Sequence, residues 1–297
     1  IVLAAAMTPL YLTATRKVKR QLGTVRSQRS RFTTSSKEIA LLDPYALNAF
    51  QTDGHISMDG GLSTALFERL RHHVDAFVAA QADPSIDYFP DLIAQDYAWI
   101  EYATAPAVLD AVAQILGEDI ILWGSGLFCK SAVGGKATPW HQDAEYWPIR
   151  PLRTCTVWIA IDHSTTANGC LRVISGSHKA RKMYAHQANP SKNYVLNQEI
   201  APDAMPAASP VDIELKPGAI SIHDAFLVHG AEPNNSGQRR AGVAFRYMPA
   251  SSHFDRELAH RQTTELGVVD ISKRHLHLVR GVNRESRNDL SSLLVFV

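Results

Sequence analysis

The feature that most constrains the fold is a series of short apolar segments in the second half of the chain. They are rich in β-branched and aromatic residues, and turns containing Gly, Pro or Asn separate them, which is the pattern of β-strands. We predict strands at residues 120–130, 154–162, 170–174, 211–215, 219–223, 226–229 and 240–248. Helical patterns come earlier, at residues 44–50, 63–80 and 105–116. Helices followed by seven or eight strands predict a mostly β protein with flanking helices, a double-stranded β-helix (jelly roll, cupin-like).

The length of 297 residues is enough to bury one large core, so we predict a single domain over residues 43–297. Residues 1–42 form a basic N-terminal segment, in which residues 1–37 hold eight Lys or Arg and no acid. Within it, residues 7–37 resemble an organellar transit peptide, and a disordered basic tail is the alternative. The rest of the chain has 22 basic and 29 acidic residues. An acidic body argues against nucleic acid as a partner.

The cysteine content gives an expectation about the compartment. Cys129, Cys155 and Cys170 are odd in number and lie in apolar segments, so we predict buried free thiols in a reducing compartment. The expected location is the cytoplasm, with a mitochondrion or another organelle as the alternative. No run approaches the roughly 20 apolar residues that a membrane helix needs, so no membrane association is expected.

The segment Pro139-Trp140-His141-Gln142-Asp143 carries a metal-binding pattern. If the backbone is extended there, the period of two places the side chains of His141 and Asp143 on one face. One imidazole and one carboxylate are two members of the 2-His-1-carboxylate triad that holds Fe(II) and leaves positions open for substrate chemistry.

Context separates this pair from two other His-x-Asp matches, His73/Asp75 and His253/Asp255. His73 lies in a helical pattern, where residues two apart diverge and cannot share a metal. His253 follows the last clear strand and has no His-then-Arg pair behind it. Only His141 is followed, 88 residues later, by His229 and then by Arg240 eleven residues further on.

Four motifs resemble those of the phytanoyl-CoA dioxygenase family. They are Trp140-His141-Gln142-Asp143, residues 169–178, Lys216-Pro217-Gly218 before His229-Gly230, and the segment from Asn234 to Tyr247. The resemblance implies a double-stranded β-helix that binds Fe(II) and the cosubstrate 2-oxoglutarate and reacts with O2. It places His141, Asp143 and His229 at the metal and catalytic positions.

The resemblance also assigns cosubstrate-binding positions. Arg240 matches the arginine that pairs with the distal carboxylate of 2-oxoglutarate, and its guanidinium can bond a carboxylate through two hydrogen bonds. Arg239 is the rival, but only Arg240 keeps the eleven-residue spacing from His229. Lys130 is expected to help neutralise the cosubstrate, and a solvated lysine is the alternative. Where the family often has a small hydroxyl residue, this chain has Ala231, so cosubstrate binding must depend more on Arg240.

Five aromatic side chains lie near these motifs. They belong either to the core, which is common for aromatics on strands, or to a pocket that holds the substrate or surrounds a quaternary ammonium group: Trp123, Trp140, Tyr146, Trp147 and Trp158. Among them we expect Trp158 to bind the cosubstrate. The long interval at residues 179–210 is expected to be either an active-site lid or a surface insertion.

The resemblance implies a dioxygenase that hydroxylates an unactivated C–H bond and releases succinate and CO2. Halogenases of the family carry a small residue where this chain has Asp143, so hydroxylation is favoured. Residues 145–150 and 246–249 are similar to bacterial members acting on small polar molecules, including aminoethylphosphonate-type compounds, and Arg150 and Arg246 are either receptors for an anionic group or structural residues. The alternatives are an acyl-CoA hydroxylase, a non-catalytic metal-binding jelly roll and a cupin-like enzyme without 2-oxoglutarate. The sequence leaves the oligomeric state open.

Overall fold

The computed structural model describes residues 42–83, 86–284 and 286–290. All of them belong to one compact unit of the chain, Ile39–Val297. The predicted basic segment lies outside the described residues apart from Leu42, and the domain boundary at residue 43 stays a prediction. No helix among the described residues is long and apolar enough to cross a membrane.

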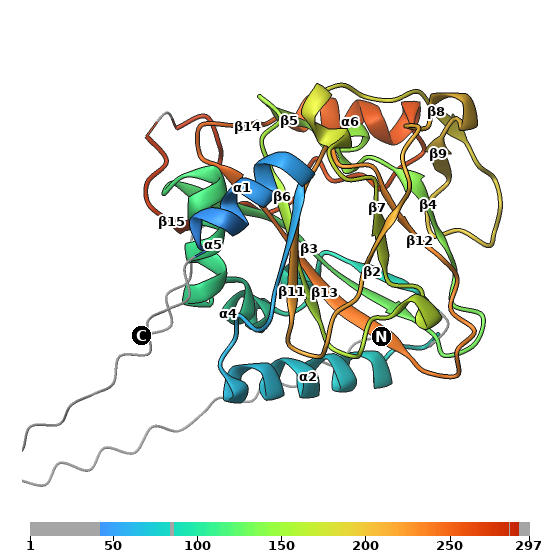
Figure 1. Ribbon diagram of the computed structural model, residues 1–297. Coiled ribbons are helices and arrows are strands. Elements are labelled where there is room, and N and C mark those ends of the chain that lie inside the picture. The colour runs from blue at the N-terminus through green and yellow to red at the C-terminus, as the bar shows by residue number, and fades with distance from the viewer. Residues whose placement is uncertain (1–41, 84–85, 285, 291–297) are drawn as a thin grey trace, which may run out of the picture. The chain divides into compact units, whose positions relative to one another are not determined.

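The larger sheet has the strand order β1-β11-β6-β13-β3-β15, with β2 paired to β3 outside this path (Figure 1). Its strands are β1 (His55–Met58), β2 (Tyr88–Pro90), β3 (Ile120–Lys130), β6 (Cys155–Ala160), β11 (Ile220–Asp224), β13 (Arg240–Pro249) and β15 (His277–Arg280). The central strand β13 is antiparallel to β3, from the pair Arg240 and Lys130 to the pair Pro249 and Ile120. On its other side β13 pairs with β6.

The smaller sheet has the order β10-β7-β12-β4. Its strands are β4 (Thr138–His141), β7 (Leu171–Val173), β10 (Val211–Ile213) and β12 (His229–Ala231). Two short two-stranded pairs stand apart from both sheets: β5 (Ile149–Arg150) with β14 (His253–Phe254), and β8 (His186–Ala188) with β9 (Gln198–Ile200). Single 3-10 turns lie between the strands: η1 (Tyr97–Trp99), η2 (Asp143–Glu145), η3 (Thr166–Asn168), η4 (Ser177–Ala180) and η5 (Pro202–Ala204).

Strict alternation along β13 explains why the large sheet has two different faces. Val243 and Phe245 belong to the main hydrophobic core, which includes residues of the helices. Ala244, between them, belongs to a second core that includes Trp158 of the large sheet and Val173 of the small one. Two sheets enclosing this second core form the predicted double-stranded β-helix, so the predicted fold class is confirmed.

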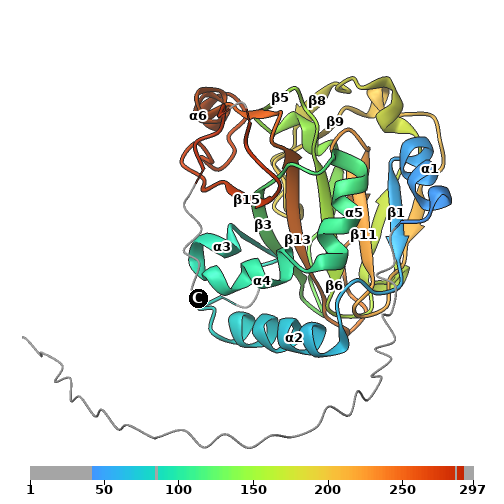
Figure 2. The same ribbon diagram turned by 90° about the vertical axis from the view of Figure 1, so that its left-hand side faces the viewer.

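Helices cover the outer face of the large sheet. They are α1 (Pro44–Asp53), α2 (Thr64–Ala79), α3 (Leu92–Gln95), α4 (Ile100–Ala103) and α5 (Pro106–Leu116). The sixth helix, α6 (Arg256–Glu265), packs instead against the hydrophobic cluster that contains Trp147. Figure 2 shows α5 in front of the strands of this sheet, and α5 contacts β3 and β13. The helices α1 and α2 begin where predicted because the Asp43 and Ser63 side chains accept hydrogen bonds from backbone N–H groups of the first turn.

The structure corrects two expectations. The strand predicted at residues 226–229 is a turn, and β12 begins only at His229. The strand β4 ends at His141, so Asp143 lies in the turn η2 rather than on the strand. The interval at residues 179–210 contains the β8 and β9 pair.

Candidate functional site

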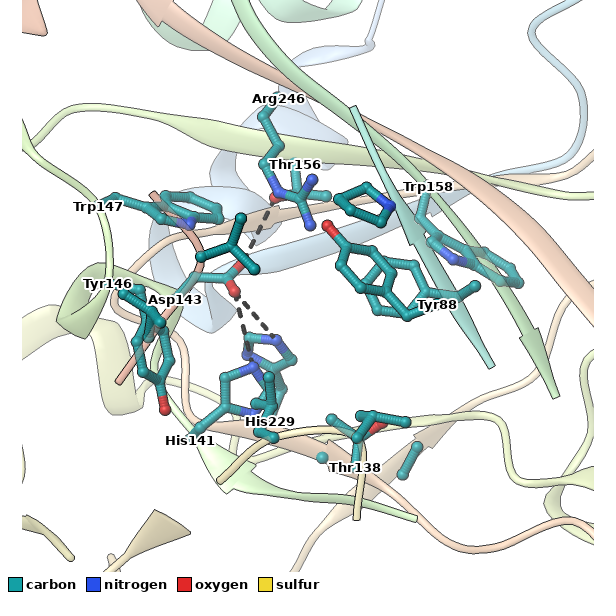
Figure 3. A pocket seen from close by; sticks show the side chains of 18 of the residues that line it. Tyr88, Thr138, His141, Asp143, Tyr146, Trp147, Thr156, Trp158, His229 and Arg246 are labelled. Carbon is teal, nitrogen blue, oxygen red and sulfur yellow. Dashed lines mark hydrogen bonds and ion pairs between the residues drawn. The ribbon is translucent and has the colours of Figure 1, made fainter. Parts of the chain in front are cut away.

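Two histidines and one aspartate meet between the sheets. His141 ends β4, Asp143 opens η2, and His229 begins β12 directly opposite His141 in the sheet register. Their ligand atoms all lie within 4.8 Å of one another. Oδ1 of Asp143 is 3.6 Å from Nε2 of His141 and 4.0 Å from Nε2 of His229, and Figure 3 shows the three side chains converging.

Backbone hydrogen bonds fix the direction in which both imidazoles point. Nδ1 of His141 donates to the Pro139 carbonyl at 2.8 Å, and Nδ1 of His229 donates to the Leu227 carbonyl at 2.8 Å. A donating Nδ1 leaves the Nε2 lone pair free as a ligand. Burial, together with the neighbouring His141, lowers the pKa of His229 well below its ordinary value. The neutral imidazole that binds metals is therefore the stable form.

Asp143 is held as a carboxylate between the two sheets. Burial alone would raise its pKa, but the contacts with His141, His223 and His229 lower the pKa of Asp143 well below its ordinary value. Its second oxygen, Oδ2, lies 3.5 Å from Oγ1 of Thr156 and 3.5 Å from Nε2 of His223. One carboxylate oxygen thus faces the two histidines of the small sheet, and the other faces the large sheet.

His223 is a site residue that the sequence reasoning missed. It lies on β11, is 5% exposed, and its Nε2 is 3.5 Å from Oδ2 of Asp143, although we assigned it no role in the site. Its position opposite Thr156 in the pairing of β11 with β6 brings it to the pocket. The alternation along β11 was the available signal, because Ile220 and Ile222 face the main core and His223 faces the other way.

The donor set fits Fe(II). Two neutral imidazoles and one carboxylate, buried and within reach of a single point, are the ligands of the non-haem iron triad. In the part of the chain that the structure describes, these three residues form the group of metal-binding side chains close enough to share an ion.

Arg240 is a buried cation without an anionic partner. It pairs with Lys130 across β13 and β3 and is 5% exposed. Its Nε donates to Oγ of Ser164 at 3.3 Å, and its guanidinium carbon lies 4.7 Å from the centre of the Trp158 ring. No carboxylate among the described residues forms an ion pair with Arg240. Burial lowers the pKa of Arg240 to about 10, which leaves it charged at neutral pH.

Lys130 lies beside Arg240 in the sheet but does not line the pocket. The side chain is 2% exposed, and Nζ donates to the Glu232 carbonyl. Burial and the charge of Arg240 lower the pKa of Lys130 to about 7. Arg239, the rival of Arg240, points elsewhere, because its guanidinium pairs with Asp162 and Asp75 at 2.8 Å each.

The cavity has a volume of about 380 Å³ and reaches the metal-binding cluster and Arg240, but not Lys130. Its lining includes His141, Asp143, His223, His229, Arg240 and Arg246, and also the three aromatics Tyr146, Trp147 and Trp158. Trp123 and Trp140 are not among its lining residues, and Trp123 is buried in the core. Ala231 also lines the pocket, at the position where the family often has a small hydroxyl residue. Arg150 lies outside the lining and donates to the Trp147 and Ile149 carbonyls, which favours its structural alternative.

Gln142, between the two ligands, ties the pocket to the segment at residues 179–210. Its side chain is fully buried and donates to the Lys182 and Phe226 carbonyls at 3.1 and 2.8 Å. Its Oε1 accepts a hydrogen bond from the Tyr184 N–H at 2.7 Å. Further along the segment, Val195, Leu196 and Asn197 line the pocket.

Fold and site together define the class, a double-stranded β-helix protein with a 2-His-1-carboxylate cluster in its central pocket. The family model described as phytanoyl-CoA dioxygenase (PhyH) matches residues 50–242, and the chain belongs to this family. The membership confirms the resemblance found in the sequence motifs.

Individual relatives agree with the family. A probable phytanoyl-CoA dioxygenase of Caenorhabditis elegans is 27% identical over 193 residues, which are 62% of this chain and 62% of the relative. A probable alpha-ketoglutarate-dependent hypophosphite dioxygenase of Stutzerimonas stutzeri is 28% identical over 148 residues, 49% of this chain and 51% of that protein. A solved non-heme monooxygenase, ThoJ in its apo form, has a TM-score of 0.62 and 27% identity, covering 80% of this chain and 84% of that one. The chain spans about three fifths of the length of the curated phytanoyl-CoA dioxygenases that it matches.

Proposed function

We propose that the protein is an Fe(II)- and 2-oxoglutarate-dependent dioxygenase that hydroxylates a C–H bond of a small polar metabolite and releases succinate and CO2. The observation that carries this proposal is the meeting, in one cavity, of the His141, Asp143 and His229 cluster with the buried and unpaired Arg240. A metal site that does not use 2-oxoglutarate would not explain why the buried guanidinium of Arg240 has no anionic partner among the described residues.

The three clustered side chains would hold Fe(II) through Nε2 of His141, Nε2 of His229 and Oδ1 of Asp143. When bound, iron supplies the reaction of O2 with 2-oxoglutarate, which leaves succinate and CO2 and puts one oxygen atom into the substrate. The backbone contacts of both Nδ1 atoms keep the imidazoles oriented before any ligand arrives.

Arg240 and Trp158 would hold 2-oxoglutarate in the cavity, and Lys130, which does not line it, would act only through its charge. The free Nη groups of Arg240 can form two parallel hydrogen bonds with the distal carboxylate. Lys130 adds positive charge from the neighbouring strand, and Trp158 fixes the plane of the guanidinium. Ser164 accepts a hydrogen bond from Nε of Arg240 and so helps to orient its guanidinium.

The cavity supports a small substrate, because its volume of about 380 Å³ must also accommodate 2-oxoglutarate. The relative named as a hypophosphite dioxygenase points in the same direction. The relatives named as phytanoyl-CoA dioxygenases favour a second candidate, an acyl-CoA hydroxylase whose substrate would leave its nucleotide outside the cavity.

Succinate release by the anaerobically iron-loaded protein, given 2-oxoglutarate and O2, tests the proposal. The substrate panel contains small amines, phosphonates and acyl-CoA esters. We expect one class to stimulate succinate release, His141→Ala to abolish it, and His260→Ala, at an exposed position on α6, to leave it unchanged. Release that survives in His141→Ala refutes the assignment. Iron binding without any succinate, even uncoupled, supports the non-catalytic metal-binding alternative.

We propose a reducing compartment, such as the cytoplasm, for this reaction. Cys129, Cys155 and Cys170 are buried and free. Burial raises the pKa of both Cys129 and Cys170 to about 11, so neither thiol is a reactive thiolate at neutral pH.

A further inference from the structure

Two further buried arginines, Arg246 and Arg274, line the cavity and are not used by the proposed reaction. Arg246 is 7% exposed, and its buried Nε has no hydrogen-bond partner. No carboxylate in residues 42–83, 86–284 and 286–290 forms an ion pair with it. The side chain of Arg274 is 8% exposed, and its Nε lies 3.5 Å from Oδ2 of Asp91. Two cations therefore share one acid, and both line the cavity.

The two guanidinium groups lie close together over Gly124 of β3. Arg246 is paired with Gly124 across β13 and β3. A Cβ on Gly124 would lie 3.2 Å from Nη1 of Arg274 and 3.5 Å from Cδ of Arg246, so both side chains occupy the space over this residue. Two residues on, a Cβ on Gly126 would lie 3.0 Å from the Tyr88 hydroxyl. The missing side chains on β3 thus make room for two guanidinium groups and one phenol.

Each of the two guanidinium groups also lies near an aromatic ring. The guanidinium carbon of Arg246 lies 5.6 Å from the centre of the Trp147 ring, and that of Arg274 lies 5.8 Å from the centre of the Trp123 ring. Figure 3 shows the Arg246 guanidinium and the Tyr88 hydroxyl directed into the same part of the pocket. Such packing restricts both arginines to one orientation before a ligand binds.

The charges at this place are unbalanced. Burial lowers the pKa of Arg274, Asp91 raises it, and the like charge of Arg246 lowers it further. A buried cation without a partner is costly, and an oxyanion bound in the guanidinium fork removes that cost. The anion is not the distal carboxylate of 2-oxoglutarate, because Arg246 lies six residues from Arg240, about 20 Å along an extended strand. A five-carbon diacid is much shorter than that.

We propose that Arg246 and Arg274, with the Tyr88 hydroxyl, form a subsite for the acidic head group of the substrate, a carboxylate or a phosphonate on an apolar body. The proposal rests on the proposed function only where it calls the ligand a substrate. The subsite itself is defined by the binding of an acid. The apolar part of the same cavity would receive the body of the ligand; its lining includes Phe128, Leu171, Val195, Leu196, Val268 and Val269.

Binding of three probes with the same five-carbon tail tests the subsite: hexanoate, pentylphosphonate and hexanamide. Isothermal titration calorimetry measures each probe against protein loaded with Ni(II) and 2-oxoglutarate, in which no turnover occurs. The variants are Arg246→Gln, Arg246→Lys and Arg274→Gln. The matched control is Arg69→Gln, at a half-exposed arginine of α2 that pairs with Glu101 outside the cavity.

We expect at least one acid to bind the wild type about 10-fold or more tightly than hexanamide, and the comparison of the two acids identifies the preferred oxyanion. Arg246→Gln and Arg274→Gln should weaken that acid by about 10- to 100-fold and leave hexanamide unchanged. Arg246→Lys should fall between wild type and Arg246→Gln, because lysine keeps the charge but loses the fork. Arg69→Gln should match the wild type.

Two results overturn the proposal: neither acid binds the wild type more tightly than hexanamide, or the variants weaken all three probes equally. The affinity for 2-oxoglutarate and the melting temperature are measured for every variant, so a misfolded protein is recognised. If the wild type prefers the acid but never releases succinate, the proposed function fails while the subsite stands. If it releases succinate but shows no preference for the acid, only the subsite fails.

Discussion

Replacing Arg240 by glutamine should change cosubstrate affinity and stability in opposite directions. Arg240 donates one hydrogen bond, to Ser164, and keeps its two Nη groups for a ligand. Glutamine can replace neither the charge nor the fork, so about 3 kcal/mol of binding free energy is lost, and the Kd for 2-oxoglutarate rises about 150-fold. Titration calorimetry with the Ni(II)-loaded protein measures this change.

The stability of the same variant without 2-oxoglutarate should not fall. Burial lowers the pKa of Arg240 to about 10, so keeping the group charged in the folded protein costs about 3 kcal/mol at neutral pH. A neutral glutamine removes this cost, against the loss of one hydrogen bond and the contact with Trp158. We therefore expect a melting temperature at least equal to that of the wild type. Excess 2-oxoglutarate should then raise the melting temperature of the wild type far more than that of Arg240→Gln.

Arg239→Gln is the matched control, because Arg239 is adjacent to Arg240 in the chain but has carboxylate partners. Its guanidinium is partly exposed and pairs with Asp162 and Asp75. Its loss should cost about 1 kcal/mol of stability after solvent screening and leave the Kd for 2-oxoglutarate unchanged. The reasoning is refuted if Arg239→Gln, and not Arg240→Gln, weakens 2-oxoglutarate binding, or if Arg240→Gln alone destabilises the ligand-free protein strongly.

Three further substitutions test single contacts. In the wild type, the Kd for 2-oxoglutarate should rise from about pH 6 to about pH 8 as Lys130 loses its proton, because burial and Arg240 bring the pKa of Lys130 to about 7, and Lys130→Met should flatten this dependence. The charged and titratable groups that act on this lysine are Arg240, Asp87, Glu232 and Cys170. His223→Leu removes a contact with the Asp143 carboxylate and should weaken metal affinity about 10-fold or more, measured by competition with a chelating dye. Gly242→Ala places a Cβ 1.8 Å from Cζ2 of Trp158, so we expect about 1 to 3 kcal/mol of destabilisation in a denaturant titration and weaker 2-oxoglutarate binding.

Each of these three has a contrary outcome. An unchanged pH dependence in Lys130→Met would show that another group titrates. Wild-type metal affinity in His223→Leu would mean that the carboxylate needs no support from the large sheet. A Gly242→Ala variant with normal 2-oxoglutarate binding would separate the Trp158 position from cosubstrate affinity.

Local periodicity was enough to predict most of the sheet and the inward face of β13. The alternation at residues 240–248 places Arg240 and Arg246 on the face with Gly242 and Ala244, and the cavity receives both arginines. Asp143 reaches the cluster although β4 ends at His141, because the backbone of Gln142 is still extended, with φ −117° and ψ 128°. The alternation of side chains between two faces therefore continues beyond the end of β4.

The residues that the sequence did not predict depend on pairing between distant segments. His223 comes to the Asp143 carboxylate through the register of β11 with β6, which no local pattern encodes. Arg274 lies in a C-terminal segment of weak periodicity, and only the folded chain brings it to Gly124 on β3. Tertiary register, rather than residue type, was the missing information in both cases.

The hydrogen bonds of Gln142 have a consequence for how this protein can diversify. They anchor the start of the segment at residues 179–210 to the strand that carries His141, at Lys182 and Tyr184. Changes in length or sequence before the β8 strand would therefore disturb the position of His141. The stretch around Val195 is attached at a different point, because the Val195 N–H donates to the Ala137 carbonyl at 3.0 Å, just before β4. Because this stretch lines the cavity, exchanging its side chains while keeping that backbone contact would change which ligands fit without moving His141.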